Sequence, residues 1–182
     1  MMNKFKWQER LILGSECQEQ FVDNQRVPEI ANLDILMSGV STMFGTFCLE
    51  RVKPDNHTLL FTFDGSGQIT TSTSSIKIEA HTLTVLPANE PFLMKLDGNK
   101  WSLAWFNLMD TPNWRLLCKD QPLVRSNNRC FSVYHALSLI YHEPNPTVRA
   151  DTIRQLSNYL KESLSRSTSI AREPHRLDIL FQ

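Results

Sequence analysis

The sequence predicts a mainly β domain, closed as a barrel, with helices near its C-terminal end. Two observations lead to this prediction. Between residues 33 and 108, short runs rich in Phe, Thr and Leu alternate with turn residues, the pattern of an all-β sandwich or barrel. After Pro112 the apolar residues recur at three- and four-residue spacing, which indicates amphipathic helices. A chain of 182 residues is long enough for one such core.

The predicted strands follow one another with recognisable turns. The run TMFGTFCLERV is followed by HTLLFTFDGSGQI, in which Asp64-Gly65-Ser66-Gly67 predicts a tight turn. In SIKIE, isoleucines alternate with charged residues, which indicates a strand with one wet face. The stretch PFLMKLDGNKWSLAWFNL predicts a hairpin around Asp97-Gly98-Asn99. Residues 1–32 are interpreted only as an arm or an edge.

Two helices are expected after the strands. Apolar residues recur from Asn127 to His142, and the sequence EPNP ends that pattern. Asn145 and Pro146 predict the start of the second helix, with Asn as the cap and Pro in the first turn. The second helix carries one narrow apolar stripe, opposite a side of charged and amide residues. The stripe consists of Ile153, Leu156, Leu160 and Leu164.

Composition argues against several classes of protein. Nineteen Lys and Arg residues balance nineteen Asp and Glu residues, so no sequence-wide field attracts nucleic acid or an anionic membrane. No apolar run suits a signal peptide or a membrane span. We therefore expect a soluble, cytoplasmic protein. Its cysteines form no C-x-x-C pair and are expected to be reduced; they are Cys17, Cys48, Cys118 and Cys130.

Trp101 and Trp105 lie four residues apart in the last predicted strand. Because side chains alternate across a strand, both rings share one face with Leu103. Two large rings inside a barrel provide an apolar wall on which a ligand can stack. Small barrels are also commonly packed solid, so the same rings can simply fill the interior. Both interpretations stay open at this point.

Three stretches stand in a particular order along the chain: DGSGQI, TLTVLPANEPF and WSLAWFNL. Together with the helices that follow, they resemble the sensor domain of the AraC family of bacterial transcription regulators. The resemblance covers residues 33 to 182. It implies a cupin-like barrel, a double-stranded β-helix or jelly roll, followed by a two-helix dimerisation element.

The resemblance also divides the chain into parts. Residues 1–32 form an N-terminal arm or edge, residues 33–112 the barrel sensor, residues 127–166 the helical dimerisation element, and residues 167–182 a linker. In the family, a DNA-binding domain with helix-turn-helix units follows this linker. That domain is missing from this chain, so DNA contact is expected only through it.

A ligand site inside the barrel is implied as well. In a sugar sensor of the family, the residue matching Trp105 stacks on the ligand and the one matching Leu103 adds a polar contact, which leucine cannot make. Asp64 stands where that sensor has a ligand-clamping arginine, and an acid there favours a cation or a donor-rich ligand. The alternative is that Asp64 only stabilises a turn. The expected lining is Trp105, Trp101, Leu103, Asp64, Thr62 and Leu60.

The apolar stripe of the second helix has two interpretations. It can pack against the barrel within one chain, or it can form the seam of a homodimer. Its narrowness and its charged opposite side favour the seam. The sequence therefore predicts a homodimer through Ile153, Leu156, Leu160 and Leu164.

Catalysis is not expected. Metal-dependent cupins need converging His and carboxylate ligands, commonly with an H-x-H pair, and the chain has no such pair. Phe92 stands where the resemblance would place a histidine. No nucleophile elbow and no phosphate-binding glycine loop occurs either, and no cofactor is predicted. The histidines are His57, His81, His135, His142 and His175.

The sequence thus predicts the ligand-sensing and dimerisation domain of an AraC-type regulator. A small-molecule effector in the barrel would control the attached helix-turn-helix domain. Two alternatives remain open: a stand-alone, metal-free cupin that binds a small molecule, and a filled barrel that serves only protein interaction.

Overall fold

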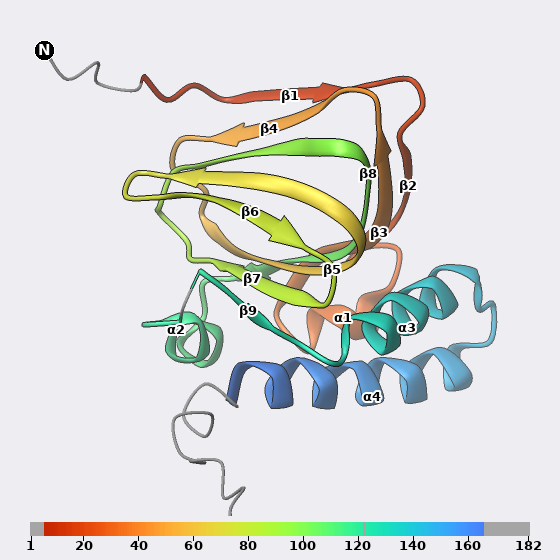
Figure 1. Ribbon diagram of the computed structural model, residues 1–182. Coiled ribbons are helices and arrows are strands. Elements are labelled where there is room, and N and C mark those ends of the chain that lie inside the picture. Colours follow the sequence, from red (N-terminus) through yellow and green to blue (C-terminus); the bar gives the residue numbers. More distant parts are fainter. Residues whose placement is uncertain (1–5, 122, 166–182) are drawn as a thin grey trace, which may run out of the picture.

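The computed structural model describes residues 6–121 and 123–165. Two layers of β-strands face each other, and the helices cover the outside of one layer (Figure 1). The strands are β1 (Arg10–Leu13), β2 (Gln18–Asp23), β3 (Ile35–Phe44), β4 (Phe47–Arg51), β5 (Asn56–Thr71), β6 (Ser75–Glu79), β7 (Thr82–Leu86), β8 (Phe92–Met109) and β9 (Val124–Ser126). The helices are α1 (Pro28–Ala31), α2 (Pro112–Cys118), α3 (Cys130–His142) and α4 (Pro146–Ser165). The predicted class, mainly β with C-terminal helices, is confirmed.

Two long strands, β5 and β8, belong to both layers. They pair antiparallel over their whole length, from Asn56 opposite Met109 to Thr71 opposite Phe92. One half of this ribbon lies in the first layer, whose order is β2-β3-β8-β5-β7-β9. The other half lies in the second layer, whose order is β1-β4-β8-β5-β6. The bent ribbon therefore joins the two layers into one barrel.

The two turns predicted along β5 and β8 are bends within continuous strands. Gly65 pairs with Trp101 and Gly67 with Leu96, so Ser66 alone stands opposite residues 97–100. The Ser66 hydroxyl donates to the carbonyl of Asp97 across the bend, at 2.5 Å. The predicted hairpin is therefore a bend within β8. A glycine with positive φ occurs in bulges as well as in tight turns, so the Asp-Gly signal does not distinguish the two. Gly65 and Gly98 have φ values of +73° and +95°.

Apolar side chains form two cores, one on each face of the first layer. One core lies between the layers and includes Leu60, Trp101 and Leu103. The other lies between the first layer and the helices and includes Phe61 and Phe106. Because both faces are covered, all residues from 57 to 62 are buried, which explains why Leu59, Leu60 and Phe61 are consecutive apolar residues in β5.

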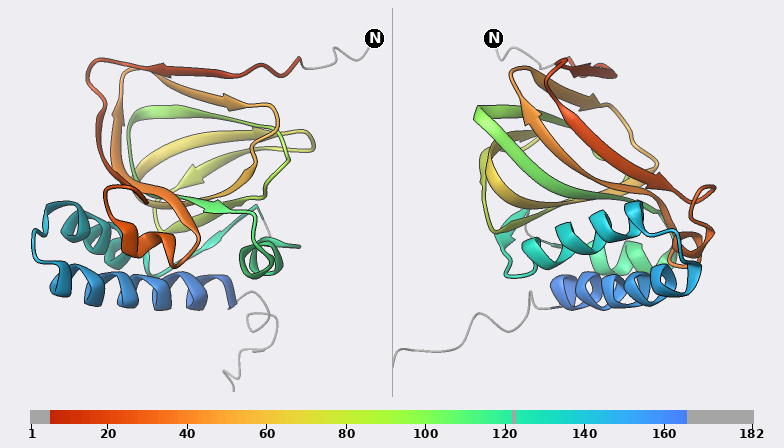
Figure 2. Two further views of the ribbon diagram at one scale, coloured as in Figure 1. Left: turned by 180° about the vertical axis from the view of Figure 1, so that it is seen from behind. Right: turned by 90° about the vertical axis from the view of Figure 1, so that its right-hand side faces the viewer.

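The helices stack on one side of the barrel, as both views in Figure 2 show. α3 contacts β3, β5 and β8, and α4 contacts α1, α2 and α3. The predicted start of α4 is confirmed: the side-chain oxygen of Asn145 accepts hydrogen bonds from the backbone nitrogens of Thr147 and Val148, at 2.9 and 3.4 Å. None of the helices in the described ranges is long and apolar enough to cross a bilayer.

The apolar stripe of α4 is part of the core of a single chain. Its four residues are between 0% and 4% exposed and belong to the same cluster as Phe106. They are Ile153, Leu156, Leu160 and Leu164. In this structure these residues are therefore not accessible for the dimer seam that the sequence predicts. A narrow stripe looks the same in sequence whether it packs on its own chain or on a partner's helix.

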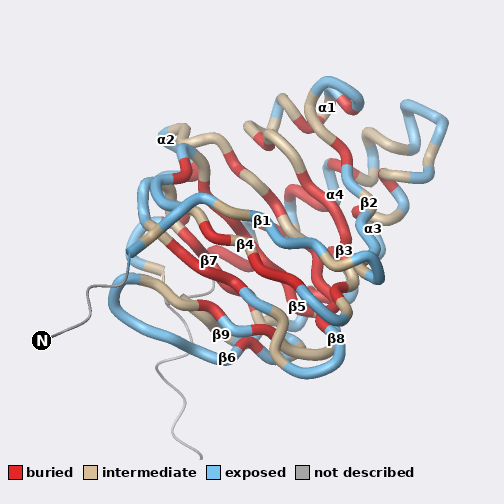
Figure 3. The backbone as a smooth tube through the Cα atoms, turned by 90° about the horizontal axis from the view of Figure 1, so that it is seen from above, coloured by how far each residue is buried: buried red, intermediate tan, exposed pale blue. Residues whose placement is uncertain are grey.

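The N-terminal segment forms an edge of each layer. β1 pairs with β4 in the second layer, and β2 pairs with β3 in the first. Residues 1–32 were interpreted as an arm or an edge, and β1 and β2 are edge strands. Seen from above, the central strands are mostly buried whereas β1 is largely exposed (Figure 3). The predicted linker, residues 167–182, lies outside the described residues.

Candidate functional site

A cavity of about 210 Å³ lies between the two layers, beside the edge strands β1 and β2. Its floor consists of buried apolar side chains contributed by four strands, β3, β4, β5 and β8. They are Met43, Phe47, Leu60, Phe92, Met94 and Leu103. The mouth includes Leu11, Phe21 and Trp105, together with the charged residues Glu19 and Arg51. The site is therefore an apolar cavity with a polar rim.

Trp105 forms a wall of this cavity, and its orientation is fixed. Its indole nitrogen donates to the Ser41 hydroxyl at 2.8 Å, and that hydroxyl donates to the Glu19 carboxylate at 3.0 Å. The ring lies beside Gly39, where an added Cβ would come within 2.9 Å of the indole. Phe21 flanks the ring at a centroid distance of 6.4 Å. Because the indole donor is already satisfied, Trp105 offers a ligand only its ring surface.

Trp101 fills the barrel instead of lining the cavity. It is fully buried, and its indole nitrogen donates to the Thr62 hydroxyl at 3.1 Å. The ring packs edge-on against Phe47 and lies against Gly67, where an added Cβ would come within 2.4 Å of it. Neither Trp101 nor Thr62 borders the cavity, although both were predicted to do so. Of the two tryptophans, Trp101 therefore fills the interior, whereas Trp105 lines the cavity.

Asp64 lies outside the barrel. It is exposed and pairs with Lys100 at 2.9 Å, and it also accepts a hydrogen bond from the backbone of Gly65. The hydrogen bond from Lys100 is the main cause that lowers the pKa of the Asp64 carboxyl. The prediction failed because β5 is bulged between Thr62 and Asp64, opposite Leu103 and Ser102. One extra residue reverses the side-chain alternation that the prediction assumed.

Leu60 and Leu103 occupy the predicted place. Both are buried, and both belong to the cavity floor together with Met43 and Met94. Of the six residues predicted to line the barrel, the structure brings three to the cavity. They are Leu60, Leu103 and Trp105.

The polar rim was missed from the sequence. Arg51 lies with Nε 2.9 Å from a carboxylate oxygen of Glu9, an ion pair without a well-aligned hydrogen bond. Thr58 donates to the side-chain oxygen of Asn107 at 3.4 Å. Glu19 lies on β2, in a segment that had been interpreted only as an arm or an edge. The alternation in QEQFVD was the available signal, since Glu19 and Phe21 both line the cavity.

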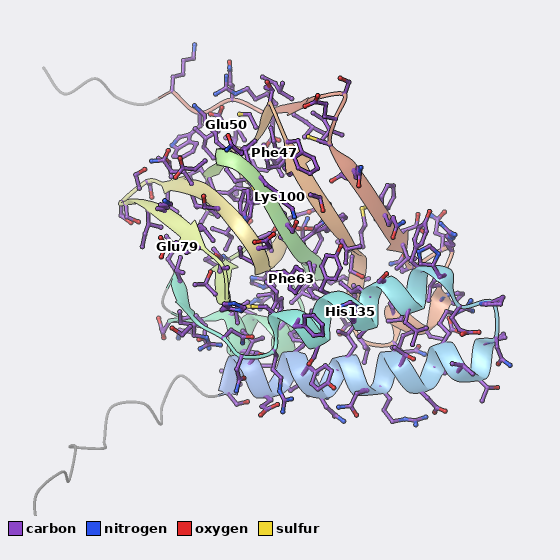
Figure 4. All side chains as sticks on the ribbon, turned by 45° about the vertical axis from the view of Figure 1, so that its right-hand side comes forward. Phe47, Glu50, Phe63, Glu79, Lys100 and His135 are labelled. Carbon is purple, nitrogen blue, oxygen red and sulfur yellow. The ribbon has the colours of Figure 1, made fainter. Side chains whose placement is uncertain are left out.

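Residues before and within β1 bind to the second layer through Glu50. This carboxylate is only 1% exposed, accepts a hydrogen bond from the backbone of Gln8 at 2.9 Å, and lies 2.8 Å from Nε of Arg10. Figure 4 shows Glu50 and Phe47 in the part of the barrel farthest from the helices, with Phe63 and His135 beside α3. The N-terminal segment is therefore attached at the end of the molecule that also holds the cavity mouth.

The buried His57 joins neighbouring parts of the fold through hydrogen bonds. One ring nitrogen accepts from the backbone of Ala88 at 2.9 Å, and the other lies 2.9 Å from Asp110, which also binds Arg115. These bonds tie the loop before β8 to both long strands. Within the part of the chain that the structure describes, no group of three or more His, Cys, Asp or Glu side chains could hold a metal ion.

Comparisons with known proteins identify similar solved structures and nothing more. No protein-family model and no curated protein matches the chain. A cupin superfamily protein from Desulfitobacterium hafniense has a TM-score of 0.44 at 12% identity, over 54% of this chain and 83% of that chain. A predicted oxalate decarboxylase from Thermotoga maritima has a TM-score of 0.44 at 7% identity, over 57% and 94%. The coconut allergen cocosin has a TM-score of 0.48 at 9% identity, over 54% and 28%.

The first of these structures is described as a cupin superfamily protein. Similarities at such scores and identities carry no information about ligand, activity or membership of the AraC family. The fold class rests on the strand arrangement of this chain itself, and a fold does not by itself imply a function.

Proposed function

We propose that this chain is the ligand-sensing domain of an AraC-type transcription regulator, acting in the cytoplasm. The observation that supports it most is the composition of the cavity mouth. Leu11 of β1 and Phe21 of β2 line the same cavity as the barrel floor. A ligand in this cavity would contact both the barrel and the N-terminal edge strands.

The mechanism that we propose is a shift between two placements of the N-terminal segment. Among the described residues, β1 pairs only with β4, over four residues, and three of its residues are exposed. A ligand that touches Leu11 favours the placement in which β1 covers the cavity. The shift can be no larger than the difference in the ligand's affinity for the two placements. A DNA-binding domain attached after the linker would be repositioned by that change.

A homodimer through the helical element remains part of this proposal. Because the stripe of α4 is buried, pairing would have to use the outer surface of the helices. That surface includes Phe131 and Leu139 of α3, which are 58% and 44% exposed. We also propose that the domain is not an enzyme, since the cavity floor consists of apolar side chains and offers no general acid, base or nucleophile.

A stand-alone small-molecule binding barrel is the second candidate, and the same cavity supports it. The reading frame after the codon for Gln182 distinguishes the two candidates. The regulator proposal expects about a hundred further residues with two helix-turn-helix patterns. A filled barrel that serves only protein interaction is disfavoured by the presence of the cavity.

Limited proteolysis tests the sensor mechanism directly. We expect a ligand that binds the cavity to slow tryptic cleavage at Arg10, because it adds contacts to β1. In a Leu11→Ser variant, the same ligand should bind more weakly and protect Arg10 less. If saturating ligand changes neither the cleavage rate at Arg10 nor the dimer affinity, the sensor mechanism is wrong.

A further inference from the structure

The charges at the cavity mouth are unevenly compensated. Arg51 and Glu19 are the two charged residues of the lining. The charge of Arg51 is offset by Glu9, whose carboxylate lies 2.9 Å away and also accepts a hydrogen bond from the backbone of Val52. Among the described residues, the partner of Glu19 is the neutral hydroxyl of Ser41. The mouth therefore carries one carboxylate that forms no ion pair within the described part of the chain.

This carboxylate stands beside the aromatic wall. Glu19 and Phe21 are two residues apart on β2, so both point toward the cavity. The Ser41 hydroxyl links Glu19 to the indole of Trp105, which holds the carboxylate at the edge of the ring. A carboxylate next to two aromatic rings is a favourable environment for a positive charge, because ring faces carry negative potential.

The floor of the cavity excludes a highly hydroxylated ligand. It consists of Leu, Met and Phe side chains, and such a surface leaves sugar hydroxyls without partners, which is costly. The polar groups near the mouth, Thr58 and Asn107, are hydrogen-bonded to each other. The floor instead suits a compact apolar body. A cavity of ~150 Å³ holds benzene, so about 210 Å³ accommodates one ring with a short substituent.

We propose that the cavity binds a small lipophilic cation, namely an amine or quaternary ammonium with one ring or a short alkyl body. Its positive group lies between the Glu19 carboxylate and the ring of Trp105, and its apolar body lies on the floor formed by Leu60, Leu103 and Met94. This inference rests on the proposed function of the cavity and names the ligand class. The acid that selects the ligand is then Glu19, and not Asp64, which lies outside the barrel.

Calorimetric titration of the 182-residue chain with three probes of similar size tests the inference. Benzylamine is cationic at pH 7, benzyl alcohol is neutral and benzoate is anionic. We expect benzylamine to bind at least about tenfold more tightly than either of the others, as a charge-assisted and cation–π contact predicts. The wild-type comparison needs no substitution, so a folding defect cannot obscure it.

Two variants with the same change in charge locate the effect. Glu19→Gln keeps an acceptor for the Ser41 hydroxyl but removes the charge, and it should abolish the preference for benzylamine. Asp64→Asn removes an exposed charge outside the cavity and should leave the preference unchanged. Equal binding of benzylamine and benzyl alcohol, or tighter binding of benzoate, would overturn the cation inference while leaving the cavity as a binding site. If none of the probes binds up to millimolar concentration, both the binding site and the cation inference fail.

Discussion

Replacing Leu160 by alanine tests whether α4 belongs to the core of one chain. Leu160 is fully buried within a single chain, in the cluster that joins the helices to the first layer. The substitution removes three carbon atoms, which is about 2.4 kcal/mol of transfer free energy at ~0.8 kcal/mol per buried methylene. A residual cavity adds to this, so we expect a loss of about 3 kcal/mol in the free energy of unfolding.

Urea unfolding followed by circular dichroism at several protein concentrations provides the measurement. If Leu160 is a core residue, the urea midpoint of the variant should fall by the same amount at every protein concentration. If it is a seam residue, the urea midpoint should depend on protein concentration. Val148→Ala is a matched control, because Val148 lies on the same helix and is 42% exposed. It should change the unfolding free energy by less than about 0.5 kcal/mol. An unchanged unfolding free energy for Leu160→Ala, together with loss of a dimer, would refute the core assignment.

Three further predictions concern the barrel and its thiols. Gly67→Ala should lower the unfolding free energy by about 1–3 kcal/mol, because the new methyl group would meet the ring of Trp101; an unchanged urea midpoint would contradict this packing. The pKa of Asp64 is lowered in the folded state, chiefly by the hydrogen bond from its lysine partner, so its stabilising effect exists above the ordinary value of 3.8 and is lost as the pH falls through the folded value. The stability difference between wild type and Asp64→Asn should therefore shrink below about pH 4, and a difference that stays constant down to pH 2 would argue against the pair. Burial raises the pKa of the Cys130 thiol to about 12, so iodoacetamide at pH 8 should label half-buried Cys17 first, as peptide mass spectrometry can show; equal labelling rates would contradict this burial.

Local features of the sequence were enough to predict the fold class and several of its parts. The change from strand-like to helix-like spacing after Pro112 separates the barrel from the helices, because each period is a property of its own segment. Asn145 caps α4 as predicted, since a cap needs only the residues next to it. Leu103 and Trp105 face the cavity because no bulge intervenes between them in the pairing with β3.

Only the tertiary structure decided what each segment meets. The bulge after Thr62 turns Asp64 out of the barrel, and bulges depend on how two strands are forced to bend together. The sequence of the α4 stripe does not specify which surface it packs against. Its contacts with α1, α2 and α3 bury it within the chain. Glu19 reaches the cavity mouth because β2 pairs with β3 next to Gly39, where the missing side chain leaves room for the Trp105 ring. Such contacts join residues far apart in the chain, and a local pattern cannot specify them.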